Sequence, residues 1–463
     1  MPASRFAASP TDGDGSTPHA APLRACVYAM ERPPDTQFAA LRACLPAHAR
    51  FALFGDCAAT DAWPDAERVA AVADAWHPGA VLAAAAARFA GEHLVLVRAD
   101  LDLPELACER LLHALAQPDV LGAVALDGIW RRPLPPDAGP GTDARRLDAI
   151  CFAYSDRRLV DDAHAVAPVG FSAWHGARLA RLGPARALDR DALDAAGLRI
   201  VLLDHLYVEG GAAIHTPHPA ERDPRDPPPP SALAPLQQRI AAALTTDATP
   251  SCPGLDAKPV ILHVLHGWGG GAERWVRDFA AADASAHHLV LIARGSFARR
   301  QHGEWLELHD GALAGPPLRR WPLPRPIADT ALGDDAYRGL LAQVVRTYCV
   351  DAIVVSSLIG HSLDALRSGL PTVCVVHDHY PLWPALHRDF GDPALPFDDA
   401  QRARDLGADD AGEFANRDPA HWKRLRDATV GALREAGAML VAPSRSALAN
   451  QLRLAPELGE LRA

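Results

Sequence analysis

The sequence lacks the closely spaced cysteines that zinc ribbons and small disulfide frameworks require. Its 463 residues include eight cysteines, but no two of them have the CxxC spacing. They are scattered over positions 26, 44, 57, 108, 151, 252, 349 and 374. The spacing argues against both kinds of framework, and reduced thiols in the cytosol are the simplest interpretation.

The sequence also lacks a basic block and a long apolar run. Its net charge is −11, which argues against a general nucleic-acid-binding protein. The longest candidate for membrane burial, residues 79–91, is too short to span a bilayer and contains Arg88. Residues 1–22 have no apolar core of signal-peptide length and are typical of a disordered tail. We therefore expect a cytoplasmic protein, and peripheral contact with the inner face of the membrane stays open.

A proline-rich stretch divides the chain. Residues 216–258 include four consecutive prolines and several Asp-Pro steps, which favour a semi-rigid linker, interrupted by a short helix at about 232–244. We accordingly predict one domain over residues 23–215 and a second over residues 259–463.

The N-terminal domain alternates predicted strands and helices. Apolar runs predict strands at 24–30, 49–55, 92–99 and 121–126, and helices at 36–45, 64–76, 81–90 and 104–116. This alternation favours an α/β fold with a mainly parallel sheet.

The C-terminal domain shows the same alternation more clearly. Strands are predicted at 260–265, 288–293, 352–357, 372–378 and 438–444, and helices at 336–348, 360–369 and 424–436. Residues 316–326 form a proline-rich excursion between them. The pattern is typical of a Rossmann-like, doubly wound domain whose parallel sheet is buried on both faces.

Three glycines, Gly269, Gly270 and Gly271, follow the first strand of this second domain in the string ILHVLHGWGGGAERWVRDFA, residues 261–280. Glycine lets the backbone approach a ligand closely, and free amides at a helix start attract anions or hydroxyls. The string does not match GxGxxG, so a dinucleotide fingerprint is a poor fit. A tight strand-to-helix turn explains the glycines equally well, and both interpretations remain open.

Three segments of this domain together resemble family 4 glycosyltransferases of the two-domain GT-B fold. They are HGWGGGAERWVRDFA, GLPTVCVVHDHYPLWP and GAMLVAPSRSALANQL, at 266–280, 369–384 and 437–452. The resemblance implies that the first domain of that fold occupies 259–463 and that His377 contacts the transferred sugar. It also implies a set of residues lining the donor and substrate cleft: Gly269, Gly270, Gly271, Glu273, Asp378 and Ser444. For Asp378 and Ser444, ordinary helix capping is the alternative.

The N-terminal domain resembles a divergent family 2 glycosyltransferase of the GT-A fold. The resemblance lies in residues 91–126, where Asp100 and Asp102 match an Asp-x-Asp position, and in residues 195–218. It implies that Asp100 and Asp102 hold Mg²⁺ or Mn²⁺ bridging a nucleotide diphosphate. Asp191 and Asp194 are the nearest candidates for the catalytic base, and Glu209 stands where the family usually has histidine.

These resemblances predict a glycosyltransferase, or a fragment of a longer one. It would transfer a sugar from a nucleotide-sugar to a saccharide or lipid-linked acceptor in bacterial surface polysaccharide synthesis, such as O-antigen or capsule. The second, donor-binding domain of the GT-B fold has no counterpart before residue 463. Two alternatives remain: a non-catalytic glycan-binding or scaffold subunit with degenerate domains, and a sugar-nucleotide epimerase. The epimerase would need GxGxxG and a Tyr-x-x-x-Lys pair, which the sequence lacks.

Overall fold

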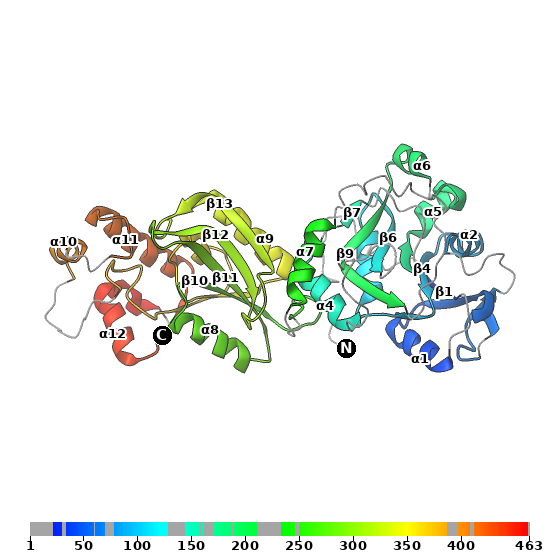
Figure 1. Cartoon of the computed structure of the whole chain (residues 1–463), viewed down its shortest axis with the longest axis horizontal. Helices are drawn as coiled ribbons and strands as arrows, with labels where there is room; N and C mark the ends of the chain where they lie inside the picture. Colours follow the sequence, from blue (N-terminus) through cyan, green and yellow to red (C-terminus); the bar gives the residue numbers. More distant parts are fainter. Residues whose placement is uncertain are drawn as a thin grey trace. The chain divides into compact units, whose positions relative to one another are not determined.

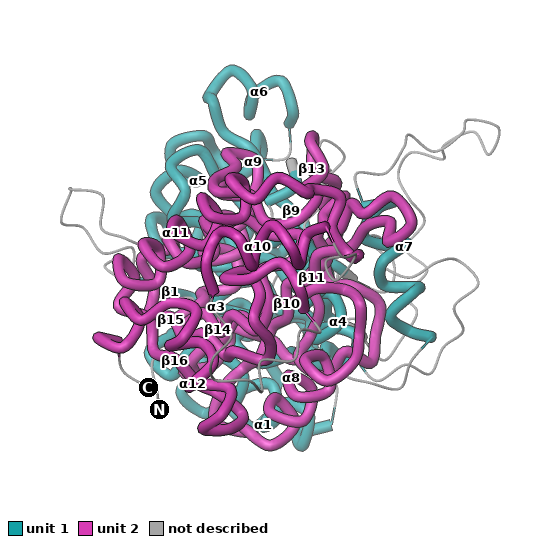
Figure 2. The backbone as a smooth tube through the Cα atoms, turned by 90° about the vertical axis from the view of Figure 1, so that its left-hand side faces the viewer, with its two compact units in different colours: residues 1–250 teal, residues 251–463 magenta. Residues whose placement is uncertain are grey.

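A computed structural model describes most of the chain, and it divides into two compact units, Met1–Pro250 and Ser251–Ala463 (Figure 2). The described residues are 22–29, 34–59, 61–69, 78–127, 144–157, 159–161, 170–187, 189–210, 233–245, 250–386, 397–407 and 412–461. Nearly all of the predicted tail and residues 216–232 and 246–249 of the predicted linker lie outside them. Each unit is an α/β structure, which confirms the predicted class.

The first unit is built on a sheet with the strand order β3-β2-β1-β4-β8-β6-β9-β5, and β7 pairs with β9. Its strands are β1 (Leu23–Tyr28), β2 (Arg50–Phe54), β3 (Glu67–Val69), β4 (His93–Arg98), β5 (Leu101–Asp102), β6 (Val120–Asp127), β7 (Leu159–Asp161), β8 (Phe171–Trp174) and β9 (Arg199–Gly210). Its helices are α1 (Asp35–Cys44), α2 (Pro78–Arg88), α3 (Ala107–Leu115), α4 (Ala144–Tyr154), α5 (Gly176–Leu182), α6 (Arg190–Ala195) and α7 (Ala234–Ala243), with the short 3₁₀ turns η3 (Gly55–Ala59) and η4 (Pro184–Arg186).

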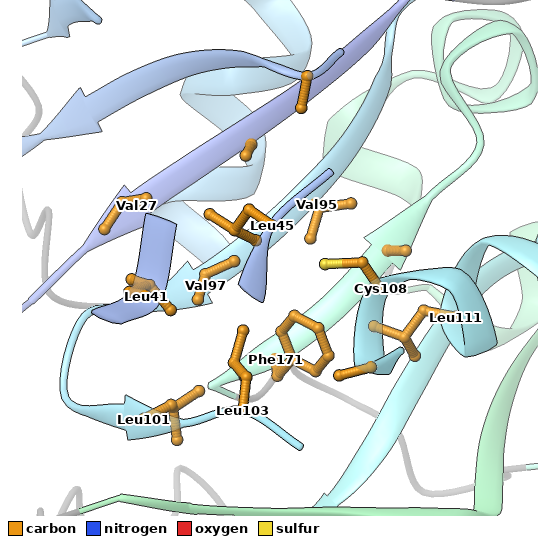
Figure 3. Packing of buried hydrophobic residues seen from close by; sticks show 14 of the residues in the cluster. Val27, Leu41, Leu45, Val95, Val97, Leu101, Leu103, Cys108, Leu111 and Phe171 are labelled. Atoms are coloured by element: carbon orange, nitrogen blue, oxygen red, sulfur yellow. The ribbon is translucent and has the colours of Figure 1, made fainter. Parts of the chain in front are cut away.

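The sheet of this unit is buried on both faces, because successive side chains of a strand point to opposite sides. In β1, Ala25 and Val27 join one apolar cluster, while Cys26 and Tyr28 join the other. Figure 3 shows part of the first cluster, where Val27 and Val97 from the sheet lie near Leu41 from α1. Such burial on both sides explains why β1 and β4 read as nearly continuous apolar runs in the sequence.

A buried ion pair ties three elements of the first unit together. The guanidinium of Arg110 in α3 donates to both carboxylate oxygens of Asp148 in α4, each at 2.9 Å, and both side chains are almost fully buried. Arg110 also donates to the carbonyl of His205, and Asp148 accepts from the amide of Tyr207, both in β9. With hydrogen bonds on both partners, this pair fixes α3 and α4 against β9.

The second unit contains a sheet with the order β13-β12-β11-β10-β14-β15-β16. Its strands are β10 (Val260–His266), β11 (His287–Ser296), β12 (Gln301–Asp310), β13 (Arg319–Ile327), β14 (Ala352–Val355), β15 (Thr372–Val375) and β16 (Met439–Val441). Its helices are α8 (Gly271–Ala282), α9 (Asp335–Tyr348), α10 (Asp399–Gly407), α11 (Pro419–Glu435) and α12 (Arg445–Leu454), with the 3₁₀ turns η5 (Leu363–Leu366) and η6 (Pro456–Glu460). In Figure 1, α8 lies on one side of this sheet and α9 on the other.

Both sheets are mixed, whereas the sequence predicted mainly parallel ones. In the second unit β11, β10, β14, β15 and β16 pair in parallel, but β12 and β13 are antiparallel. The proline-rich excursion at 316–326 is largely β13, the edge strand. Its prolines Pro322, Pro324 and Pro326 are tolerated because an edge strand needs partners on one side only.

Two predicted helices are wrong. Within the predicted helix 64–76, Glu67–Val69 forms β3, which pairs in parallel with β2, and residues 70–77 lie outside the described part. Pairing with the open edge of β2 outweighs helix propensity over so short a segment. The predicted helix 360–369 shrinks to η5, because Gly360 and Gly369 at its ends both have φ of 79°.

No helix in the described part of the chain is both long and apolar enough to cross a membrane.

We predict that Asp148→Ala lowers the free energy of unfolding of the first unit by about 3–5 kcal/mol, because it leaves the buried Arg110 guanidinium without its counter-charge. Urea titration followed by circular dichroism measures the effect. Asp194→Ala is the matched control, since Asp194 pairs with Arg190 on the surface, and it should change stability by less than about 1 kcal/mol. Equal effects of the two substitutions would contradict the assignment.

Candidate functional site

The glycine loop of the second unit lies at the carboxyl end of β10, the strand between β11 and β14. Gly269 has φ of 77° and Gly270 has φ of 82° with ψ of −152°, a conformation that residues other than glycine essentially never adopt. Gly271 begins α8 and has no such requirement. A methyl group on Gly270 or Gly271 would meet no atom within 4 Å. The turn therefore explains the first two glycines, whereas neither backbone strain nor packing explains Gly271.

The amino terminus of α8 is open to a ligand in another respect. No side chain caps it, so its first amides donate no hydrogen bond to a capping residue. Uncapped amides at a helix start favour an anion, because the helix dipole and the free N–H groups act together. The open space above Gly271 gives a ligand access to these amides.

Histidines surround this end of the sheet. Burial, together with the neighbouring imidazoles of His377 and His302, lowers the pKa of His266 to about 4. Burial also lowers the pKa of His377, which follows β15. Nδ1 of His266 and Nε2 of His377 are buried and have no hydrogen-bond partner among the described residues. At neutral pH both rings are thus uncharged, and each carries a buried nitrogen that no described residue hydrogen-bonds.

Aromatic side chains line the loop. The indole of Trp268 lies edge-on to the rings of His266 and His302, with centroid distances of 5.1 and 4.8 Å. Trp275 in α8 lies edge-on to His377 at 5.5 Å. The polar nitrogens of the site are therefore set in apolar walls, as in most small-molecule sites.

His361 supports the loop from below. It is fully buried, and its Nε2 donates to the carbonyl of Leu265 at 2.9 Å, so its Nδ1 accepts from the hydroxyl of Tyr337 in α9 at 3.0 Å. Burial lowers the pKa of His361 to about 4, which keeps this neutral tautomer. These two hydrogen bonds fix the end of β10, just before the glycines.

The other residues predicted for this site have local partners. Glu273 pairs with Arg277 one turn along α8 at 2.8 Å, and its Oε2 would lie 3.9 Å from a methyl group on Gly269. The carboxylate of Asp378 accepts from the amide of Tyr380 at 2.9 Å. Ser444 is the N-cap of α12, where its hydroxyl accepts from the amide of Ala447 at 3.1 Å. The capping alternative therefore describes the contacts of Ser444.

α12 also contacts the residue next to His377. The side-chain amide of Gln451 donates to the carbonyl of Asp378. This bond joins α12 to the residues that follow β15. Each of the three segments of the resemblance also contributes a strand or the end of one, β10, β15 and β16, to the same sheet.

In the first unit, Asp100 and Asp102 follow β4. The guanidinium of Arg98 donates to Oδ1 of Asp100, while Oδ2 of Asp100 is buried and has no hydrogen-bond partner in the described structure. Asp102 is exposed in β5, which pairs with the end of β9. The orphan oxygen of Asp100 fits a divalent cation, but the charge of Arg98 opposes one. Among the described residues no group of three or more His, Cys, Asp or Glu side chains is placed to hold a metal ion.

Asp191 and Asp194 lie away from this pair. They belong to α6, which leads into the amino end of β9, whereas Asp100 follows the carboxyl end of β4. β4 and β9 run in the same direction, since β8 pairs antiparallel with both β4 and β6, and β6 is parallel to β9. The predicted base therefore lies at the amino ends of these parallel strands and the predicted metal ligands at their carboxyl ends.

Two cavities of about 280 and 310 Å³ lie in the first unit, and none of these carboxylates lines either of them. The smaller is lined by Pro118, Arg178, Arg181, Leu182, Ala196, Gly197 and Leu198. Arg178 already donates to the carbonyls of Gln117 and Leu115, so its guanidinium holds neighbouring backbone in place. The unpartnered polar groups of the second unit therefore indicate the candidate site better than the volume of these cavities does.

Sequence reasoning missed several residues of the site. His266 and Trp268 stand within the glycine string, and their position directly after a buried strand was a usable signal. His302 belongs to β12, a strand that the sequence did not predict, so nothing indicated that it would lie beside Trp268.

No protein-family model matches the chain, and a search of curated proteins finds no significant match. The case for a function therefore depends on the residues themselves.

We predict that the second unit loses stability as the pH falls from about 6.5 to about 4. A histidine whose pKa is lower in the folded than in the unfolded chain takes up a proton on unfolding, so its contribution is complete above pH 6.5 and is lost on acidification. His263, His266 and His361 all have such pKa values, about 3, 4 and 4. Urea titrations at pH 7.5, 5.5 and 4.5 measure how the free energy of unfolding changes with pH.

The matched variant is His361→Gln, whose amide can keep the bond to the Leu265 carbonyl without titrating. It should reduce the loss of stability over this range by about 1–3 kcal/mol. If the free energy of unfolding depends on pH equally in the variant and the native protein, His361 does not contribute to this dependence.

Proposed function

We propose that the chain is a glycosyltransferase, or part of a longer one, that binds a nucleotide-sugar and transfers its sugar to a saccharide or lipid-linked acceptor. The observation that carries the proposal is the uncapped start of α8, open above Gly271, beside the unpartnered nitrogens of His266 and His377. The resemblance of the three segments to family 4 glycosyltransferases supports the same conclusion. Assembly of a surface polysaccharide on the cytoplasmic side of the membrane is the setting we propose.

The donor diphosphate would lie at the amides of α8. The amides and the helix dipole stabilise the charge that grows on the diphosphate as the bond to the sugar breaks. An anion beside His377 raises the pKa of its imidazole, because it favours the protonated ring. His377 can then donate a hydrogen bond to a sugar hydroxyl or to the departing phosphate.

In the first unit we propose that Asp100 and Asp102 hold Mg²⁺ or Mn²⁺, the metal that would offset charge on a bound diphosphate. The orphan Oδ2 of Asp100 supports this assignment. We assign no base to Asp191 or Asp194, because α6 lies at the amino ends of the strands and Asp100 at their carboxyl ends.

We predict that Gly271→Ala weakens nucleotide-sugar binding at least tenfold without destabilising the fold. The methyl group would enter the open space above the α8 amides, while alanine at a helical position stabilises by up to about 1 kcal/mol. Calorimetry with UDP-, GDP- and dTDP-sugars, alongside thermal unfolding, measures both effects.

Gly339→Ala is the matched control, since Gly339 is an exposed glycine inside α9 whose added methyl also meets nothing within 4 Å. It should stabilise equally and leave binding unchanged. Binding of no nucleotide-sugar by the native protein, or equal binding by the two variants, would overturn the proposal for the second unit.

We predict that Asp100→Asn weakens Mn²⁺ binding at least tenfold, because the neutral amide removes one of the two charges that face the cation. Titration of the protein with Mn²⁺ alone, followed by water proton relaxation, measures the affinity without any activity assay. Asp191→Asn is the control, as Asp191 is exposed in the first turn of α6. Identical isotherms for the native protein and Asp100→Asn would remove the metal assignment.

A non-catalytic glycan-binding or scaffold subunit is the second candidate. It is favoured by the ion pair of Arg98 with Asp100 and by the pairing of Asp194 with Arg190, which leave the first unit without an assembled set of carboxylates in its described part. Saccharide binding without binding of any nucleotide-sugar would support this candidate.

A further inference from the structure

Phe297 is the most exposed large apolar side chain of the described residues, at 60%. It lies in the turn between β11 and β12, where its ring is edge-on to the indole of Trp268, with centroids 5.6 Å apart and an angle of 81°. Single exposed apolar side chains are ordinary on protein surfaces. This one differs because its neighbour belongs to the glycine loop, so the pair borders the candidate site.

The backbone holds the two aromatic residues in place. A methyl group on Gly295, in the bulge before Phe297, would lie 2.1 Å from the carbonyl oxygen of Gln301. A methyl group on Gly267, next to Trp268, would lie 2.6 Å from the carbonyl oxygen of Ala293. Only glycine permits these approaches, so the turn and the loop are kept close to each other.

A buried histidine backs the pair. The ring of His302 lies 4.8 Å from Trp268 and 6.0 Å from Phe297, and its Nε2 donates to the carbonyl of Glu413 at 2.8 Å. Burial lowers the pKa of His302, so the ring is uncharged at neutral pH. The aromatic surface is therefore fixed from behind and partly exposed in front.

We infer that the exposed ring of Phe297, held edge-on against Trp268, is a stacking platform for a pyranose ring of the acceptor, so that the acceptor of this site is a saccharide. The inference rests on the proposed function of the same site. One face of a sugar ring presents C–H groups that pack on aromatic rings, while its hydroxyls reach polar groups at the side. Here His266, two residues before Trp268, supplies an unpartnered nitrogen. The platform would hold the acceptor ring next to the α8 amides, where the donor diphosphate would lie.

The test uses the full chain on an array of printed oligosaccharides from bacterial surface polysaccharides, followed by calorimetry with the strongest binder. Phe297→Ala should weaken its binding at least tenfold, which corresponds to about 1.4 kcal/mol, because the exposed ring face is lost. Phe297→Tyr keeps that face and should stay within threefold of the native protein. Leu332→Ala is the control, since Leu332 is also exposed, at 43%, in the same unit.

Binding of nucleotide-sugars is measured on the same variants to separate the two proposals. Phe297→Ala should leave the affinity for nucleotide-sugars unchanged. If the native protein binds oligosaccharides but no nucleotide-sugar, the proposed function is contradicted and the platform is not. The platform is overturned if no oligosaccharide binds the native protein, or if Phe297→Ala binds with unchanged affinity. It is also overturned if Phe297→Ala impairs binding to phosphatidylglycerol vesicles but not to saccharides, which would make the turn a membrane contact.

Discussion

The parallel pairing of β10 with both β11 and β14 is the constraint on which the second unit depends. Both edges of this strand are paired, and on the face that α8 covers its mid-strand His263 is fully buried against His288 and Phe279. Its polar side chains can then act only where the strand ends. His266, the glycine loop and the start of α8 lie at that end, and the hydrogen bonds of His361 to Leu265 and Tyr337 fix it. The location of the candidate site thus follows from strand pairing.

The two units differ in how they treat their polar groups. In the second, burial keeps His266 and His377 neutral and leaves a nitrogen of each without a partner, so the charge in this site has to come from the ligand. In the first, carboxylates are neutralised within the protein: Asp148 by Arg110 and Asp100 by Arg98. The diphosphate that we propose would therefore bind the second unit directly, whereas in the first unit it would need the proposed cation as mediator.

Much of the secondary structure could be predicted. The strands β1, β2, β4 and β10 lie within two residues of their predicted bounds. A strand buried on both faces consists of nearly continuous apolar residues, which makes it easy to identify in the sequence. β13 could not be predicted, because its prolines are acceptable only at a sheet edge, and edge position depends on which strands pair. The conformation of Glu67–Val69 was predicted wrongly for a related reason: so short a segment fits a helix or a strand, and the available partner β2 decides.

For the site, the sequence by itself determined the chemistry that is local: glycines at positions of positive φ, a helix start after them, and a histidine at or just after the end of each of two strands. The tertiary structure decided what depends on distance along the chain. It placed His302 of β12 against Trp268, left the space above Gly271 open, and put Asp191 and Asp194 at the strand ends opposite Asp100. The reason is physical: backbone conformation is set by a residue and its neighbours, whereas strand order and direction are set by pairing between distant segments.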